Sequence, residues 1–177
     1  FLDYHYGTEA SADYVIGTRK NIRNDKPVIG TYDVNSEGSS DMYYKGANML
    51  HTLRQLVNDD EKWRQLLRGL NETFYHQTVT TQEIENYIST FSGLNLSAVF
   101  NQYLRDVRVP TLEYSIKDNE LSYRWINIVD GFQMPVEIEI NEEIQWLYPT
   151  ADWKIMEINS TKINIDRDYY IDHKQLN

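Results

Sequence analysis

The spacing of hydrophobic residues changes at Pro110. Before this proline, apolar residues recur every three or four positions, which is the period of a helix with one buried face. After it, apolar and polar residues mostly alternate, which is the period of a strand with one buried face. The pattern therefore predicts a helical part followed by a β part.

Four segments before Pro110 carry the helical period. A possible capping box from Thr80 to Glu83 opens the third segment and Gly93 closes it, as caps of these types do. The apolar positions of the four segments are Gly46, Met49, Leu50, Leu53, Leu56 and Val57; Trp63, Leu66, Leu67, Leu70 and Phe74; Ile84, Tyr87, Ile88 and Phe91; and Leu96, Val99, Phe100, Tyr103 and Leu104.

The first forty residues show a weaker pattern. A further helix is predicted over about residues 3–20, with Tyr6, Ala10, Tyr14 and Ile16 facing inward. A polar stretch, residues 24–41, follows without a period. Connections of this length are often functional, although a plain surface loop explains the stretch equally well.

The β part is predicted to contain about seven short strands. A turn over Lys117–Glu120, with Asp118 and Asn119 at its tip, joins the first two. The strand segments are Leu112–Ile116, Leu121–Trp125, Val136–Ile140, Ile144–Leu147, Trp153–Ile158, Lys162–Ile165 and Tyr169–Ile171. Short strands at this density predict a small antiparallel β-sandwich, so the fold class is α+β, with one domain over residues 1–109 and another over residues 110–177.

Composition excludes several function classes. The chain has 17 basic and 27 acidic residues and a net charge of −10, which argues against nucleic acid as a partner. It has no cysteine, so disulfides, thiolate metal sites and cysteine nucleophiles are excluded, and both periplasm and cytoplasm remain open as its location. No apolar run reaches the roughly 20 residues of a membrane span, so none is predicted.

Motifs for metal binding are missing from the sequence. The four histidines, His5, His51, His76 and His173, are scattered, and no H-E-x-x-H occurs, so no metal ligand is predicted within the chain. The acidic run from Asp59 to Glu61 stands at a predicted helix start, where the helix dipole favours negative charge.

The segment from Gly38 to His51 is the candidate for chemistry. Polar residues that can cap a helix lead into a first turn with Tyr43, Tyr44 and Lys45. A tyrosine hydroxyl held at such a place can donate a hydrogen bond to a developing oxyanion. Alternatively, Tyr43 is the first member of a buried stripe that continues through Gly46 and Leu50, and the pattern alone leaves both interpretations open. No substrate-binding residue is predicted.

The run Met42–Arg54 resembles the tyrosine motif of the aminopeptidase N family of zinc metallopeptidases. That motif is Tyr, a variable residue, Lys, Gly and a small residue, followed by an apolar helix. Five further blocks resemble the family in the same order, namely Asp59–Trp63, the helix with Leu66–Arg68, Val79–Thr81, Ser92–Leu96 and Arg108–Leu112. The resemblance covers about residues 38–115 and is closest to bacterial members of a short type that ends after a β-sandwich.

The resemblance implies a fold and one catalytic residue. The helical part would be the C-terminal portion of a thermolysin-like catalytic domain. By its place in the motif, Tyr43 would be the catalytic tyrosine that stabilises the tetrahedral oxyanion. Gly46 would allow close helix packing, Lys45 has no assigned role, and Tyr44 occupies the variable position.

The family's zinc ligands and its exopeptidase motif are not in this sequence. In the family they precede the tyrosine, so in a full-length parent they would lie upstream of Phe1. Zinc is therefore expected as the cofactor of the parent only, and the expected partners are peptide substrates and the N-terminal part of the parent chain. The fragment alone is expected to be inactive, which zinc-dependent release of an amino acid from an aminoacyl-anilide by the purified chain would contradict.

A second interpretation is a non-catalytic module, helical plus β-sandwich, that binds proteins or glycans. The sequence upstream of this chain discriminates between the two, because H-E-x-x-H followed by a glutamate on a helix would identify an enzyme.

Overall fold

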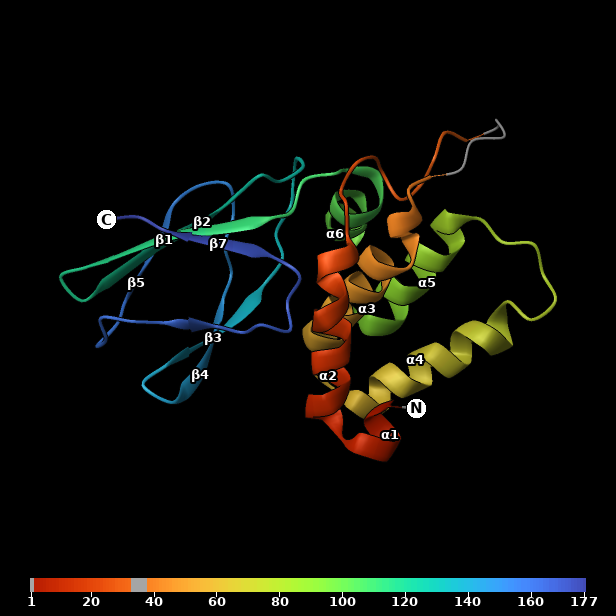
Figure 1. The fold of residues 1–177 in the computed structure, drawn as a ribbon, viewed down its shortest axis with the longest axis horizontal. Coiled ribbons are helices and arrows are strands. Elements are labelled where there is room, and N and C mark those ends of the chain that lie inside the picture. The colour runs from red at the N-terminus through yellow and green to blue at the C-terminus, as the bar shows by residue number, and fades with distance from the viewer. Residues whose placement is uncertain (1, 33–37) are drawn as a thin grey trace.

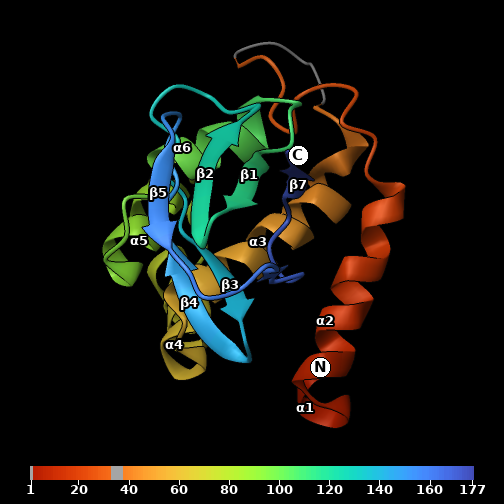
Figure 2. The same ribbon diagram turned by 90° about the vertical axis from the view of Figure 1, so that its left-hand side faces the viewer.

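The computed structural model describes residues 2–32 and 38–177. Helices occupy the chain before Pro110 and strands the chain after it, and the two groups of elements lie side by side (Figure 1). The same division is visible in the orthogonal view, where the strands stand in front of the helices (Figure 2).

The N-terminal helix is interrupted. It consists of α1 (Leu2–Tyr6), α2 (Thr8–Gly17) and a 3₁₀ turn, η1 (Thr18–Asn21). The break lies at Gly7, whose φ of 88° is easily adopted only by glycine. The predicted inward face is wrong, because Tyr6 and Tyr14 are 67% and 63% exposed and Ala10 is also exposed. The buried residue of α2 is Ala12, and the helix packs against α3.

The remaining helices follow the prediction closely. They are α3 (Tyr44–Val57), α4 (Asp60–Thr73), α5 (Thr81–Ser92) and α6 (Ser97–Phe100), which continues into a π-helical turn, η3 (Asn101–Arg105). The capping box between Thr80 and Glu83 is confirmed, and Gly93 ends α5 with a φ of 77°. Asp59 caps α4 by accepting a hydrogen bond from the amide of Lys62.

Nine of the twenty predicted apolar positions are buried and nine more are partly buried. The buried ones are Met49, Leu53, Trp63, Leu66, Ile88, Leu96, Val99, Phe100 and Tyr103. Leu50 and Leu67 differ, since they are 39% and 40% exposed. The predicted stripes on α3 and α4 are thus wider than the surfaces that these helices bury in this chain.

Within the described residues, seven strands form two sheets. They are β1 (Thr111–Lys117), β2 (Glu120–Ile126), β3 (Val136–Ile140), β4 (Glu143–Leu147), β5 (Lys154–Glu157), β6 (Asn164–Ile165) and β7 (Asp172–Gln175). One sheet has the order β5-β2-β1-β7 and the other β4-β3-β6. Every pair is antiparallel except β1 with β7, which is parallel and corrects the prediction of a purely antiparallel part. The fold is therefore mixed helix and sheet, consistent with α+β, and the sandwich remains a prediction.

The last predicted strand is misplaced. Tyr169 and Tyr170 are only 1% and 7% exposed, yet they precede β7, whose four residues are all exposed. The short apolar run from Tyr169 to Ile171 arises because both tyrosines are buried in the shared core, not because the backbone forms a strand there. β7 is held instead by main-chain pairing with β1.

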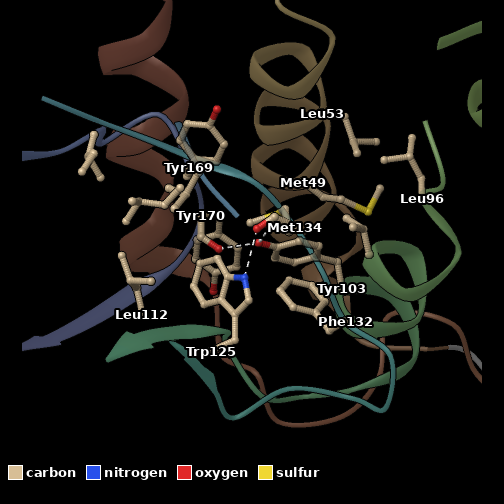
Figure 3. Close-up of a cluster of buried hydrophobic side chains, with 14 of the residues drawn as sticks. Met49, Leu53, Leu96, Tyr103, Leu112, Trp125, Phe132, Met134, Tyr169 and Tyr170 are labelled. Carbon is tan, nitrogen blue, oxygen red and sulfur yellow. Dashed lines mark hydrogen bonds between the residues drawn. The ribbon is translucent and has the colours of Figure 1, made fainter. Parts of the chain in front are cut away.

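A single cluster of buried side chains joins helices and sheets (Figure 3). At its centre the hydroxyl of Tyr103 donates a hydrogen bond of 2.7 Å to the carbonyl of Tyr170. Nearby, Nε1 of Trp125 donates to the carbonyl of Met134 at 3.0 Å. Tyr103 is completely buried, and burial raises the pKa of its hydroxyl above the ordinary range. Side chains from both sides of the predicted domain boundary at residue 110 therefore share one core. The division of the chain into two domains remains a prediction.

None of the helices in the described residues has the length and apolar character needed to cross a membrane.

Candidate functional site

Tyr43 lies where a short 3₁₀ turn, η2 (Ser40–Met42), meets α3. Its amide donates to the carbonyl of Ser40 at 3.4 Å, and its own carbonyl accepts from the amide of Ala47 at 3.0 Å. The backbone is thus held from both sides, while the side chain is 73% exposed. The interpretation of Tyr43 as a core residue is therefore wrong for this chain.

The turn before Tyr43 is capped by Ser39. The hydroxyl oxygen of Ser39 accepts from the amide of Asp41 at 3.2 Å, and the hydroxyl donates to Oδ1 of Asp25 at 2.7 Å. The hydrogen bond from Ser39 holds the pKa of Asp25 below its ordinary value. The cap thereby connects the start of α3 to the segment that follows η1.

Asp41 adds a second connection to the same segment. Its side chain is 1% exposed, and its carboxylate accepts from the amides of Arg23 at 3.0 Å and Asn24 at 2.7 Å. A buried carboxylate is stable when backbone N–H groups satisfy it in this way. Asp41 therefore fixes the backbone of Arg23 relative to the turn that carries Tyr43.

Where the structure describes it, the polar stretch over residues 24–41 is held by main-chain hydrogen bonds, one of them to the helical part. Ile29 donates its amide to the carbonyl of Leu104, and Ser39 donates to the carbonyl of Pro27, each at 3.0 Å. Residues 33–37 of the stretch lie outside the described residues. Its functional interpretation remains a prediction.

Lys45 is 1% exposed, which is unusual for lysine. Its Nζ donates to the carbonyl of Asp106 at 2.9 Å. Burial lowers the pKa of Lys45, and the carboxylates of Asp41 and Asp106 act in the opposite direction. Lys45, which had no assigned role, thus links the first turn of α3 to the segment after η3.

Asn48, one turn further along α3, is completely buried. Its amide group donates to the carbonyl of Tyr44 at 2.9 Å and to the hydroxyl of Thr18 at 3.1 Å. Its carbonyl oxygen accepts from Nε of Arg19 at 2.7 Å. Nη1 of Arg19 donates in turn to the carbonyl of Arg167 in the β part at 2.9 Å. Asn48 therefore holds together α3, the end of α2 and, through Arg19, the β part.

Four buried polar residues, here called the buried polar stripe, follow one side of α3 and its preceding turn: Asp41, Lys45, Asn48 and Thr52. Their spacing of four, three and four is visible in the sequence. Sequence analysis missed them because polar residues at helical spacing usually mark a solvated face. Their partners are distant in sequence, as when the hydroxyl of Thr52 accepts from the amide of Tyr170 at 2.8 Å.

The opposite side of α3 is open. Since successive helical residues are rotated by about 100°, Tyr43, Gly46, Ala47 and Leu50 share a face about half a turn from the buried polar stripe. We call these four residues the open face. A Cβ placed on Gly46 would meet no atom of the described chain within 4 Å. The predicted role of Gly46 in close helix packing is therefore not fulfilled inside this chain.

A hollow of about 420 Å³ lies beside Tyr43 and is here called the Tyr43 hollow. It is lined by Lys20, Asn21, Ile22, Arg23, Ser40, Tyr43 and Tyr44. The residues come from η1 and the residues after it, from η2 and from the first turn of α3. The hollow is thus built from the two segments that Asp41 and Ser39 hold together.

The histidines do not form a metal centre in the part of the chain that the structure describes, where no three His, Cys, Asp or Glu residues converge. His51 is buried, with Nε2 at 3.3 Å from Oδ1 of Asp168. The neighbouring imidazole holds the pKa of Asp168 below its ordinary value. The described residues therefore do not fit a zinc site, and we derive no catalytic step through a metal.

Comparison with known proteins gives a fold relationship. No protein-family model and no curated protein matches the sequence. Among solved structures, the chain is similar to aminopeptidase A of Legionella pneumophila in complex with aspartic acid, with a TM-score of 0.56 and 12% sequence identity. The similarity covers 92% of this chain but 22% of the Legionella chain. At this identity it establishes a likeness of fold to part of a peptidase.

Proposed function

We propose that this chain is the C-terminal portion of a zinc-dependent aminopeptidase of the aminopeptidase N family, in which Tyr43 stabilises the oxyanion. The parent would hydrolyse the first peptide bond of its substrates. The observation that supports the proposal is the exposed hydroxyl-bearing side chain of Tyr43 on a rigidly held turn. The fold likeness to an aminopeptidase supports the same conclusion.

Catalysis by an oxyanion donor requires that the donor is held before the reaction begins. Around Tyr43, Ser39 caps the preceding turn, and Asp41 and Lys45 fasten the backbone on either side of the tyrosine. The phenol itself projects from this frame and is free to contact a substrate. In the proposed mechanism its hydroxyl donates a hydrogen bond to the carbonyl oxygen as negative charge develops there.

The upstream part of the parent is the proposed partner of the open face beyond Tyr43, whose hydroxyl stays accessible to the substrate. Leu50 and Tyr43 are exposed on α3, and Tyr4, Tyr6 and Tyr14 are exposed on α1 and α2. Exposed large apolar side chains, when they gather into a patch, commonly mark an interaction site. The chain corresponds to 22% of the Legionella aminopeptidase, so a parent of similar length would have ample chain to cover this surface and to supply the zinc ligands.

The test is Tyr43→Phe in the full-length protein, which removes only the hydroxyl. Loss of one oxyanion donor is expected to lower kcat by about 10²–10³-fold, equivalent to roughly 2.7–4 kcal/mol. Zinc content and thermal stability should not change, because the phenol is exposed. Tyr75→Phe, at an equally exposed tyrosine between α4 and α5, is the control and should retain wild-type kcat.

Unchanged turnover of the Tyr43→Phe enzyme would remove Tyr43 from the mechanism. If the full-length protein has no H-E-x-x-H and releases no amino acid from aminoacyl-anilides, the alternative of a non-catalytic binding module would replace the proposal altogether.

A further inference from the structure

We propose that the Tyr43 hollow binds a carboxylate group of the peptide substrate through Lys20 and Arg23. The inference extends the proposed function, on which it depends, by naming the class of substrate. It concerns short peptides whose terminal carboxylate, or whose acidic side chain, lies one or two residues beyond the cleaved bond.

The charge of the hollow differs from that of the chain as a whole. Acidic residues outnumber basic ones by 27 to 17 in the sequence, yet the lining of the hollow contains two cations and no carboxylate. The nearest acids are already engaged, since Asp41 accepts from backbone amides and Asp25 accepts from Ser39. The hollow therefore offers positive charge that these acids do not occupy.

The two cations have no ion pair with any described residue. By contrast, Arg54, Arg105 and Arg124 each contact a carboxylate at 2.7 Å. In a chain with excess acid, two adjacent unpaired cations are an available anion site. A guanidinium and an ammonium are both suited to binding a carboxylate, the first with two parallel hydrogen bonds.

The backbone that carries these cations is fixed relative to Tyr43. Asp41 binds the amide of Arg23 at 3.0 Å and stands two residues before Tyr43. Lys20 belongs to η1, which packs against α3. The backbone of each cation is therefore held close to Tyr43, so that both side chains can reach a carboxylate beside the tyrosine.

The position of the hollow limits the distance between the bound carboxylate and the reacting bond. Tyr43 lines the hollow and is also the proposed oxyanion donor. Each residue of an extended peptide spans about 3.3–3.6 Å, so a carboxylate in the hollow lies within one or two residues of the bond at Tyr43. Dipeptides and tripeptides place their C-terminal carboxylate there, and a longer peptide places an aspartate or glutamate side chain there.

The experiment uses the full-length protein and three peptides with the same N-terminal residue. One is a tripeptide with a free C-terminus, the second is its C-terminal amide, and the third is an amide with glutamate in the second position. The free acid is expected to have a kcat/KM roughly tenfold above that of the neutral amide, because one or two charge-assisted hydrogen bonds contribute about that factor. The glutamate peptide shows whether a side-chain carboxylate is accepted in the same place.

The double variant Lys20→Gln with Arg23→Gln should reduce the ratio of kcat/KM between acid and amide to about one. Lys117→Gln is the matched control, because Lys117 is an exposed cation at the end of β1, outside the hollow, and it should keep the wild-type ratio. A ratio that survives in the double variant, or that is absent from the wild-type protein, overturns the proposal.

A binding measurement separates this inference from the proposed function. Calorimetric titration of the full-length protein with N-acetyl-alanyl-glutamate and with its diamide needs no hydrolysis. Tighter binding of the acid that is lost in the double variant, but retained in Lys117→Gln, supports the carboxylate site even if no peptide is cleaved. Equal binding of acid and diamide rejects the site even if the enzyme is active. If inorganic phosphate binds as tightly as the acid, the hollow is a general anion contact, and the proposal of a carboxylate site is overturned.

Discussion

The two sides of α3 reverse the usual distribution of polar and apolar residues. One side buries Asp41, Lys45, Asn48 and Thr52, and all four are at most 1% exposed. The other side, the open face, exposes Tyr43 and Leu50. Both belong to the same stretch of about ten residues, so neither helix propensity nor local sequence explains the difference.

The difference shows that the two sides have different partners. Each member of the buried polar stripe has a hydrogen-bond partner on another segment, which is the condition for burying polar groups without a large penalty. The side chains of the open face have no such partner among residues 2–32 and 38–177. The stripe therefore holds the fold together, while the open face is the surface to which the proposed function assigns a partner.

The strongest way to disrupt the buried side is Asn48→Leu. The change keeps the branched shape of the side chain but leaves Nε of Arg19 and the hydroxyl of Thr18 without the partner that Asn48 provides. Loss of buried hydrogen bonds of this kind should lower the free energy of unfolding by about 2–4 kcal/mol. Urea denaturation measures the loss, and Asn71→Leu on the exposed surface of α4 should change stability by less than about 0.5 kcal/mol. Equal effects of the two substitutions would mean that the stripe does not hold the fold.

Thr52→Val tests a single contact between α3 and the β part. The variant has nearly the same shape but cannot accept the hydrogen bond from the buried amide of Tyr170. An unsatisfied amide costs about 1–3 kcal/mol, which thermal unfolding would detect. Thr73→Val at the exposed end of α4 is the control. Faster hydrogen exchange at the amide of Tyr170 should accompany the loss, and unchanged exchange there would contradict the assignment.

Replacing either of two carboxylates near His51, those of Asp166 and Asp168, by an amide should change the stability of the fold in opposite directions. The imidazole lowers the pKa of Asp168, so Asp168 contributes stability above its ordinary pKa of 3.8 that is lost as the pH falls. Burial raises the pKa of Asp166, so its contribution is present below 3.8 and is lost as the pH rises through the raised value. At pH 7, Asp168→Asn should therefore lower the melting temperature and Asp166→Asn should raise it.

The size of each effect is expected to be about 0.5–1.5 kcal/mol, and both should shrink toward acid pH, where the wild-type carboxylates become protonated. Melting curves of the two variants and the wild type between pH 3 and pH 7 measure the trend. Shifts of the same sign at pH 7 would contradict the roles assigned to this pair.

Leu50→Ala addresses the open face and should have the smallest effect in the chain itself. Leu50 is 39% exposed, so its truncation should cost less than about 1 kcal/mol in the isolated 177-residue chain. In the full-length parent the same change should cost more, about 2–5 kcal/mol, if the upstream part buries the leucine. Paired denaturation curves of chain and parent give the comparison, and equal small losses in both would show that the face is uncovered.

Local signals in the sequence predicted local structure well. The capping box at Thr80, the left-handed Gly93 and the turn at Asp118 and Asn119 depend on neighbours a few residues away, and all three are present. Helical and strand periods also located most elements. The failures concern which side of an element is covered, as with Tyr14 on α2 and Leu50 on α3, because that depends on packing partners distant in sequence or outside the chain.

The candidate site was predictable only in part. The motif indicated Tyr43, but its exposure could not be predicted, since a tyrosine at that position also continues an apolar stripe. The buried roles of Lys45 and Asn48 depend on Asp106 and Arg19, which stand 61 and 29 residues away. Such pairings are a property of the folded chain, and hydrophobic periodicity contains no information about them.

The contact between Tyr170 and the helices has an evolutionary consequence. The amide of Tyr170 is bound by the hydroxyl of Thr52 and its carbonyl by the hydroxyl of Tyr103, so the helices recognise main-chain groups that nearly every amino acid possesses. Mutations that replace the side chain at this point leave both hydrogen bonds available. A joint of this kind constrains the backbone of Tyr170 more than the identity of its side chain.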